Sequence, residues 1–196
     1  MARVVYIGWF GLPETAAGIR VFQIAKLLRE SGNNVTFLCL SQPGLKENQE
    51  IQYDGFKYIR KRQFESRVKN GVNIFCGVYD LKVVKEIVEI EKPDTVIVYN
   101  DKERLTSQII SFCHKRGISV GADVTEWYEI SRSRKWNRIV AKNVDYRIKK
   151  MDKGLDYIIS ISPYFTAYYK SIGCKNVIEI PPIMDCIETA INPTLR

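Results

Sequence analysis

Short apolar segments alternate with longer amphipathic segments along most of the chain. The short segments are rich in β-branched residues and have few polar positions, which predicts strands covered on both faces. These predicted strands are residues 3–10, 35–40, 95–99, 118–124, 155–161 and 177–180. Predicted helices cover 18–31, 81–91, 100–116, 137–154 and 162–173. The alternation predicts an α/β class domain, a Rossmann-like three-layer arrangement with a mostly parallel sheet.

The pattern is weaker between residues 41 and 77. Residues 41–52 are polar and predict a loop, whereas residues 56–61 predict a strand at the edge of the sheet. Residues 66–77 receive no assignment. The length of 196 residues suits one domain with a continuous core. We expect residues 1–185 to form it, and residues 186–196 to be a tail or the start of a connection to a missing C-terminal domain.

Several classes of protein are excluded. The five cysteines lie far apart without a CxxC or Cys/His cluster, and His114 is the only histidine, which argues against a disulfide framework and a zinc site. No apolar run approaches the ~20 residues that span a bilayer, and the N-terminal segment is not a signal peptide. Neither GxGxxG nor a P-loop is present, which disfavours a dinucleotide dehydrogenase. We expect a cytoplasmic protein with no metal or other cofactor.

Positive charge is concentrated in two segments of a chain whose net charge is +8. Residues 132–153 hold nine Lys or Arg and two Asp, and residues 57–69 hold six Lys or Arg and one Glu. The first segment suits a solvated helix, an anionic membrane surface or a nucleic acid. Because no nucleic-acid-binding motif accompanies it, we rank the membrane above nucleic acid. The membrane-facing residues would be Arg138, Lys142 and Lys149.

The loop after the first strand is the first candidate site, because ligands of parallel sheets gather at the carboxyl ends of strands. It runs from Gly11 to Gly18 and enters a helix, with Arg20 close behind. A loop of this kind offers free N–H groups and a positive helix dipole to a phosphate or a sugar hydroxyl. A plain connecting loop would explain the same residues equally well.

Two further strand ends carry polar residues. Asp123 and Glu126 stand beside Trp127 and Tyr128, and this combination of acids and rings suits a bound sugar. The competing interpretation, which spacing alone favours, is a helix cap at Asp123 or Thr125 with aromatic rings that cover an edge. Asn100, three residues before Glu103, resembles a capping box, and a ligand contact would be an added role.

Together these segments resemble a known family. The sequences VVYIGW, AAGIR, FQIAKLLRESGNNVTFL, ISVGADVTEWY and YIISISPYFTAYYKSIGCKNVIEIPPIMD are similar, in order and spacing, to the N-terminal half of family-4 glycosyltransferases of the GT-B fold. The resemblance covers nearly the whole chain. The C-terminal domain of that family, which carries the paired glutamates and most nucleotide-sugar contacts, has no counterpart in these 196 residues.

The resemblance implies the acceptor-binding half of a retaining enzyme that transfers a hexose from a nucleotide sugar to a saccharide or lipid-linked acceptor, without a metal. The fragment alone would be inactive. Asp123 and Glu126 are the catalytic candidates, although relatives often have His where Asp123 stands. The implied donor and acceptor contacts are Gly11, Ala17, Gly18, Arg20, Asn100, Trp127 and Tyr128. The alternative is a non-catalytic α/β module that binds a sugar or a nucleotide.

Overall fold

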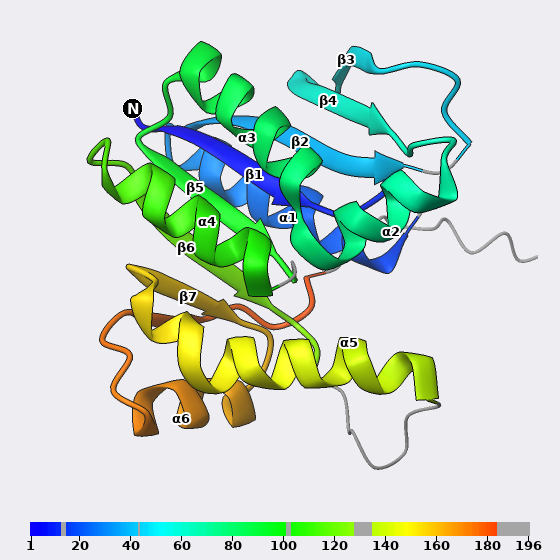
Figure 1. Ribbon diagram of the computed structural model, residues 1–196. Helices are drawn as coiled ribbons and strands as arrows, with labels where there is room; N and C mark the ends of the chain where they lie inside the picture. The colour runs from blue at the N-terminus through cyan, green and yellow to red at the C-terminus, as the bar shows by residue number, and fades with distance from the viewer. Residues whose placement is uncertain (13–14, 43, 101–102, 128–134, 184–196) are drawn as a thin grey trace, which may run out of the picture.

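The computed structural model describes residues 1–12, 15–42, 44–100, 103–127 and 135–183 (Figure 1). Its strands are β1 (Arg3–Gly8), β2 (Asn34–Gln42), β3 (Gln49–Tyr53), β4 (Phe56–Arg62), β5 (Thr95–Tyr99), β6 (Ser119–Val124), β7 (Tyr157–Ser160) and β8 (Val177–Glu179). Its helices are α1 (Ala16–Glu30), α2 (Arg67–Cys76), α3 (Val78–Glu91), α4 (Glu103–His114), α5 (Lys135–Tyr146) and α6 (Pro163–Ser171). A π-helical turn, Arg147–Met151, and a 3-10 turn, Asp152–Gly154, continue α5. The predicted α/β fold is confirmed.

The strands form one eight-stranded sheet in the order β3-β4-β2-β1-β5-β6-β7-β8. All neighbouring pairs are parallel except β3 and β4, which are antiparallel, so the expectation of a mostly parallel sheet is confirmed. From β1 the chain builds the sheet outward through β2 to β4, and then returns to place β5 on the other side of β1. The strand order therefore switches between β1 and β5, where the carboxyl ends of an α/β sheet leave a crevice.

Helices cover both faces of the sheet because its central strands are apolar on both sides. In β1, Val4 and Tyr6 pack with residues of α1, whereas Val5 and Ile7 pack with α3 and α4. Figure 1 shows α3, α4 and α5 on the near face and α1 behind the sheet. A third apolar cluster joins β6 and β7 to α6 and to the π-helical turn. Each alternate residue of a strand thus faces a different layer of helices.

The structure corrects the prediction for residues 41–62. The predicted loop contains strand β3, which pairs with β4 across a tight turn. Asp54 and Gly55 form this turn, and both have positive φ, 48° and 79°. Asp-Gly is a common sequence for such a hairpin turn, but the polar residues of β3 conceal the strand from a hydrophobic pattern. Strand β4 is therefore an inner strand, and β3 forms the edge that we expected of residues 56–61.

Helix ends account for two further differences. Residues 66–77, which received no assignment, contain α2, because the Ser66 side chain accepts from the Lys69 amide and Gly77 ends the helix in the left-handed conformation. The basic segment expected to be one helix over 137–154 is helical throughout, but it changes from α-helix to π-helix at Arg147. Arg147, the first residue of the π-helical turn, is buried and only 2% exposed.

Candidate functional site

The candidate site lies at the carboxyl edge of the sheet, where the strand order switches. Gly8 of β1 pairs with Cys39 of β2 on one side and with Tyr99 of β5 on the other, and Tyr99 pairs with Asp123 of β6. A Cβ atom on Gly8 would lie 2.8 Å from the Cβ atom of Tyr99. The absence of a side chain at Gly8 thus allows these strand ends to pack closely beneath the loops of the site.

A buried ion pair lies at the carboxyl edge of the sheet. Arg20 of α1 donates from Nη2 to Oδ1 of Asp123 at 2.8 Å and from Nε to the same carboxylate at 3.0 and 3.1 Å. The hydroxyl of Tyr6 donates to Asp123 Oδ2 at 2.6 Å. The side chain of Asp123 is 0% exposed and that of Arg20 7%. Burial raises the pKa of Asp123, and the bonds from Arg20 and Tyr6 oppose this rise.

Arg20, which the resemblance implies as a donor or acceptor contact, has partners within the protein. Its guanidinium bonds Asp123 and donates from Nη1 to the carbonyl of Ile180 at 2.9 Å. Asp123, expected near the transferred sugar, is enclosed by its bonds with Arg20 and Tyr6. The sequence does not reveal the ion pair of Arg20 and Asp123, because 103 positions separate the two residues along the chain. Tyr6, which completes the cluster, was missed because it stands in an apolar strand.

The loop from Gly11 to Gly18 closes on the side chain of Thr15. Thr15 Oγ1 accepts from the amide of Gly18 at 2.9 Å and donates to the carbonyl of Gly11 at 3.1 Å. A Cβ atom on Gly18 would lie 2.0 Å from the Gly11 carbonyl oxygen, so only glycine fits there. Ala17, in the first turn of α1, packs against the core. The first turn of α1, whose N-cap is Thr15, therefore opens at the carboxyl edge.

Asn100 links the ends of β5 and β6. Its Oδ1 accepts from the amide of Thr125 at 3.2 Å, and its Nδ2 donates to Thr125 Oγ1. The same hydroxyl lies 3.2 Å from the hydroxyl of Tyr99. Asn100 has a φ of 39°, a left-handed conformation that Asn tolerates better than most residues. Burial raises the pKa of Tyr99, so this hydroxyl stays protonated at neutral pH.

The remaining candidate residues lie in the segment after β6 and differ in their exposure to solvent. Glu126 is exposed. Trp127 is half-buried, donates from Nε1 to Asp145 at 3.0 Å, and packs against Tyr168 of α6 with ring centroids 4.7 Å apart. Its indole thus joins α5 to α6, which agrees with the interpretation of aromatic rings that cover an edge. Tyr128 lies outside the described residues.

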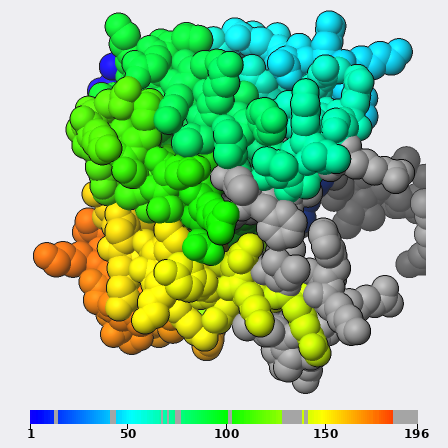
Figure 2. Space-filling view, viewed as in Figure 1, coloured from blue at the N-terminus to red at the C-terminus, as the bar shows by residue number. Residues whose placement is uncertain are grey.

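The basic face of α5 and the turns that follow it point to solvent. Arg138, Lys142 and Lys149 are exposed, as are Lys150 and Lys153. Figure 2 shows this segment on the surface below α4. Lys149 pairs with Asp145 at 2.8 Å. Within the described ranges, no helix has both the length and the apolar character needed to cross a bilayer.

No metal centre is present among the residues that the structure describes, because no three His, Cys, Asp or Glu side chains are grouped to hold an ion. Cys39, Cys113 and Cys174 form no disulfide bond. Burial raises the pKa of Cys113 to about 11, so it is not a thiolate at neutral pH.

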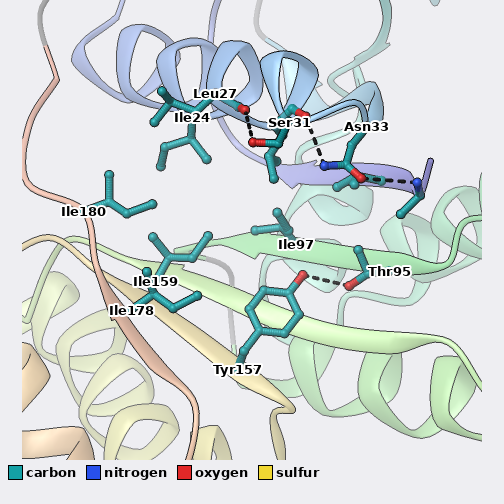
Figure 3. Close-up of a pocket in the computed structure, with 13 residues that line it drawn as sticks. Ile24, Leu27, Ser31, Asn33, Thr95, Ile97, Tyr157, Ile159, Ile178 and Ile180 are labelled. Atoms are coloured by element: carbon teal, nitrogen blue, oxygen red, sulfur yellow. Dashed lines mark hydrogen bonds between the residues drawn. The ribbon is translucent and has the colours of Figure 1, made fainter.

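A hollow on the α1 face differs in character from the candidate site. Its volume is about 370 Å³, and Figure 3 shows it between α1 and strands β5, β7 and β8. Aliphatic side chains dominate its lining, and none of the lining residues carries a charge. The hydroxyls of Tyr157 and Thr95 bond each other at 2.7 Å within it. The polar candidate residues described above lie elsewhere, at the carboxyl edge.

Comparison with known proteins finds no matching family model and no matching curated protein. Solved structures do match. Sucrose-phosphate synthase from Thermosynechococcus elongatus is similar over 92% of this chain and 48% of its own, with a TM-score of 0.61 and 13% identity. UGT2 from Phytolacca americana, complexed with UDP-2-fluoro-glucose and pterostilbene, is similar over 95% and 55%, with a TM-score of 0.61 and 8% identity.

UDP-N-acetylglucosamine 2-epimerase from Rickettsia bellii is similar over 93% of this chain and 45% of its own, with a TM-score of 0.51 and 15% identity. The chain spans about half the length of each of these three proteins. At such identities the similarity is one of fold. The described residues thus have the α/β fold of one half of a GT-B protein.

Proposed function

We propose that this chain is the acceptor-side domain of a retaining glycosyltransferase. The complete enzyme would move a hexose from a nucleotide sugar to a saccharide or lipid-linked acceptor in cell-surface polysaccharide synthesis, and a second α/β domain would supply most donor contacts. The observation that carries this proposal is the loop from Gly11 to Gly18, which opens at the switch in strand order of a GT-B half. Two solved structures similar to this chain contain UDP-2-fluoro-glucose.

The donor diphosphate would meet this domain at the N-terminus of α1. The first turn of an α-helix leaves N–H groups without intrahelical partners and carries the positive end of the helix dipole. Ala16 and Ala17 occupy this turn, and Thr15 holds the loop in shape. As the bond to the sugar breaks, negative charge grows on the leaving diphosphate, and a fixed positive dipole stabilises that charge. Arg20 then contributes indirectly, as a positioning residue.

The two candidate carboxylates would have different roles because one is buried and the other is exposed. Asp123 is enclosed by Arg20 and Tyr6 and would position the ends of β1 and β6. Glu126 is exposed at the same edge and would be the carboxylate that accepts a hydrogen bond from an acceptor hydroxyl. Asn100 holds the segment that carries Glu126 through its bonds to Thr125.

Calorimetric titration with UDP-glucose and GDP-mannose tests the proposed function. We expect the 196-residue chain to bind neither nucleotide sugar with a Kd below about 1 mM. The complete enzyme should bind one of them and transfer its sugar. Tight binding of a nucleotide by the chain alone would instead favour a non-catalytic binding module. If the complete protein neither binds nor transfers a nucleotide sugar, the proposal that it is a glycosyltransferase is overturned.

The basic face of α5 would place the enzyme at the cytoplasmic side of an anionic membrane, where lipid-linked acceptors reside. Five exposed cations, Arg138, Lys142, Lys149, Lys150 and Lys153, occupy α5 and the turns after it. Tyr146, 50% exposed, lies on the same segment. Tyr side chains favour the membrane–water interface, and each Lys or Arg near an anionic surface contributes about 1 kcal/mol.

Charge reversal tests this orientation. The variant R138E/K142E/K149E is expected to bind phosphatidylglycerol vesicles about a hundredfold more weakly than the wild type. A matched variant, K82E/K115E/K175E, reverses three exposed cations elsewhere in the chain and should keep its affinity. Sedimentation with phosphatidylglycerol and with phosphatidylcholine vesicles measures the effect. Equal binding to both kinds of vesicle would contradict the membrane role.

A further inference from the structure

Helix α6 carries an exposed tyrosine at the carboxyl edge of the sheet. Tyr164 is the second residue of α6, which begins shortly after the end of β7, and it is 67% exposed. Because β7, β6, β5 and β1 are parallel, the carboxyl end of β7 lies at the same edge as the candidate site. A single exposed ring would need no explanation, but Tyr164 has aromatic neighbours.

Three rings form a partly exposed group, here called the aromatic row. It consists of Tyr164, Trp127 and Tyr168. The ring centroid of Trp127 lies 6.3 Å from that of Tyr164 and 4.7 Å from that of Tyr168. The two tyrosines are four residues apart in α6 and therefore lie on one side of the helix. Trp127 and Tyr168 are each half-buried, so solvent reaches all three residues.

Buried neighbours hold the row in place. Trp127 donates from Nε1 to Asp145 Oδ1 at 3.0 Å. Phe165, which is only 7% exposed, stacks with Trp127 at 6.3 Å and meets Tyr164 edge-on at 5.9 Å between ring centroids. A surface that is already ordered loses little side-chain freedom when a ligand binds. The row is thus prepared for a ligand.

An ion pair stands beside the rings. Lys149 Nζ lies 5.9 Å from the ring centroid of Trp127 and 2.8 Å from Asp145 Oδ1. The side chain of Lys149 is 51% exposed and that of Asp145 21%. An ammonium group has three donors and a carboxylate has several lone pairs, so both can form further hydrogen bonds. The rings offer apolar contact, and the ion pair offers a donor and an acceptor.

We infer that the aromatic row binds a pyranose ring of a saccharide acceptor. The inference rests on the proposed function, since it names the substrate class of that same site. The C–H groups on a face of a pyranose pack against aromatic rings, while its hydroxyls donate and accept hydrogen bonds at the rim. A lipid surface is the competing ligand, because Tyr and Trp also favour membrane interfaces. The saccharide is favoured because an anionic surface would repel the Asp145 carboxylate beside the row.

The position of the row indicates the length of the acceptor. Strand β7 is three strands away from β1 in the sheet, with β5 and β6 between them. At the usual strand spacing this separation is about 14 Å. The donor diphosphate would lie at the N-terminus of α1, near the end of β1. An acceptor that reaches from there to the aromatic row contains more than one sugar unit.

Nuclear magnetic resonance titration without nucleotide sugar tests the inference. The probes are maltotriose, cellotriose and chitotriose, and sorbitol is the control because it has hydroxyls but no pyranose ring. We expect at least one trisaccharide to produce saturable shifts of the Trp127 indole N–H signal, with a Kd below about 10 mM. Sorbitol should produce none. The absence of saturable shifts with all three trisaccharides, or equal shifts with sorbitol, would overturn the inference.

Variants of Tyr164 separate the ring from mere hydrophobicity. Y164L keeps an apolar side chain without a flat face and should bind the trisaccharide at least about tenfold more weakly. Y164F keeps the ring and should retain most of the affinity. The matched control is I90A, because Ile90 on α3 is also 67% exposed, and it should bind as the wild type does. Unchanged melting temperatures show that each variant is folded.

Equal affinity of Y164L and the wild type for the trisaccharide contradicts the inference. So does a Y164L variant that binds phosphatidylglycerol vesicles more weakly but the trisaccharide normally, because the row would then be a membrane contact. Failure of the proposed function is distinguishable, since sugar transfer is measured with nucleotide sugar and these titrations are made without it. A complete enzyme that transfers sugar while Y164L binds the trisaccharide normally would lose only the aromatic row.

Discussion

An Arg20→Ala variant is expected to lose about 3–5 kcal/mol of unfolding free energy. The substitution removes three hydrogen bonds to Asp123 and leaves a carboxylate that is 0% exposed without its cation. Uncompensated burial of a charge is among the most costly single changes to a folded protein. Urea denaturation followed by circular dichroism measures the loss.

The loss should also depend on pH. Burial raises the pKa of Asp123, and removal of Arg20 removes the largest opposing effect, so the pKa rises further in the variant. A folded-state pKa above the unfolded value stabilises the protein at low pH, and this stability is lost as the pH rises through the folded-state pKa. The destabilisation of the variant should therefore be larger at pH 8 than at pH 5.

Arg3→Ala provides the matched control. Arg3 also pairs with an aspartate, Asp94, but both side chains are about half exposed and Nε of Arg3 lies 3.8 Å from Oδ2 of Asp94. An exposed pair of this kind contributes about 0–1 kcal/mol. Equal losses in the two variants would contradict a stabilising role for the buried pair.

A Gly18→Ala variant is expected to lose on the order of 3 kcal/mol and, in the complete enzyme, most of its affinity for nucleotide sugar. The added Cβ would lie 2.0 Å from the Gly11 carbonyl oxygen and 2.7 Å from its carbon. Both are backbone atoms, so no change of rotamer relieves the clash and the loop must move. Thermal unfolding and calorimetric titration measure the two effects.

Gly71→Ala is the control for this substitution. Gly71 lies inside α2, and a Cβ atom there would meet nothing within 4 Å. Alanine in a helix interior is more stable than glycine by about 1 kcal/mol, so this variant should gain stability. A Gly18→Ala variant that kept both stability and donor affinity would show that the loop is not as tight as described.

Hydrophobic pattern predicted the fold well where strands are buried on both faces. Strand β5, residues 95–99, is found with the predicted bounds because all five residues are apolar or β-branched. Strand β3 was missed because its sequence, QEIQY, is polar and lies at an edge with little to bury. Burial, not strand formation as such, produces the pattern that a sequence reveals.

The sequence predicted individual residues of the candidate site but not which of them contact one another. Arg20, Asp123 and Asn100 were all identified as polar residues at strand or helix ends. Their partners depend on how distant segments pack, as in the bond between Tyr6 and Asp123, 117 residues apart. A single sequence contains no signal for such contacts. The bonds of Arg20 to Asp123 and of Asn100 to Thr125 therefore could not be predicted from the sequence.

The two borders of the sheet are poorly suited to further strands. Strand β3 presents exposed Glu50 and Gln52 on one border, and charged or polar border strands discourage pairing between molecules. Strand β8 on the other border has only three residues and is soon followed by Pro181 and Pro182, which have no N–H to donate. The domain is thereby protected against aggregation through strand addition. Any partner domain must dock on its loops and helices rather than extend its sheet.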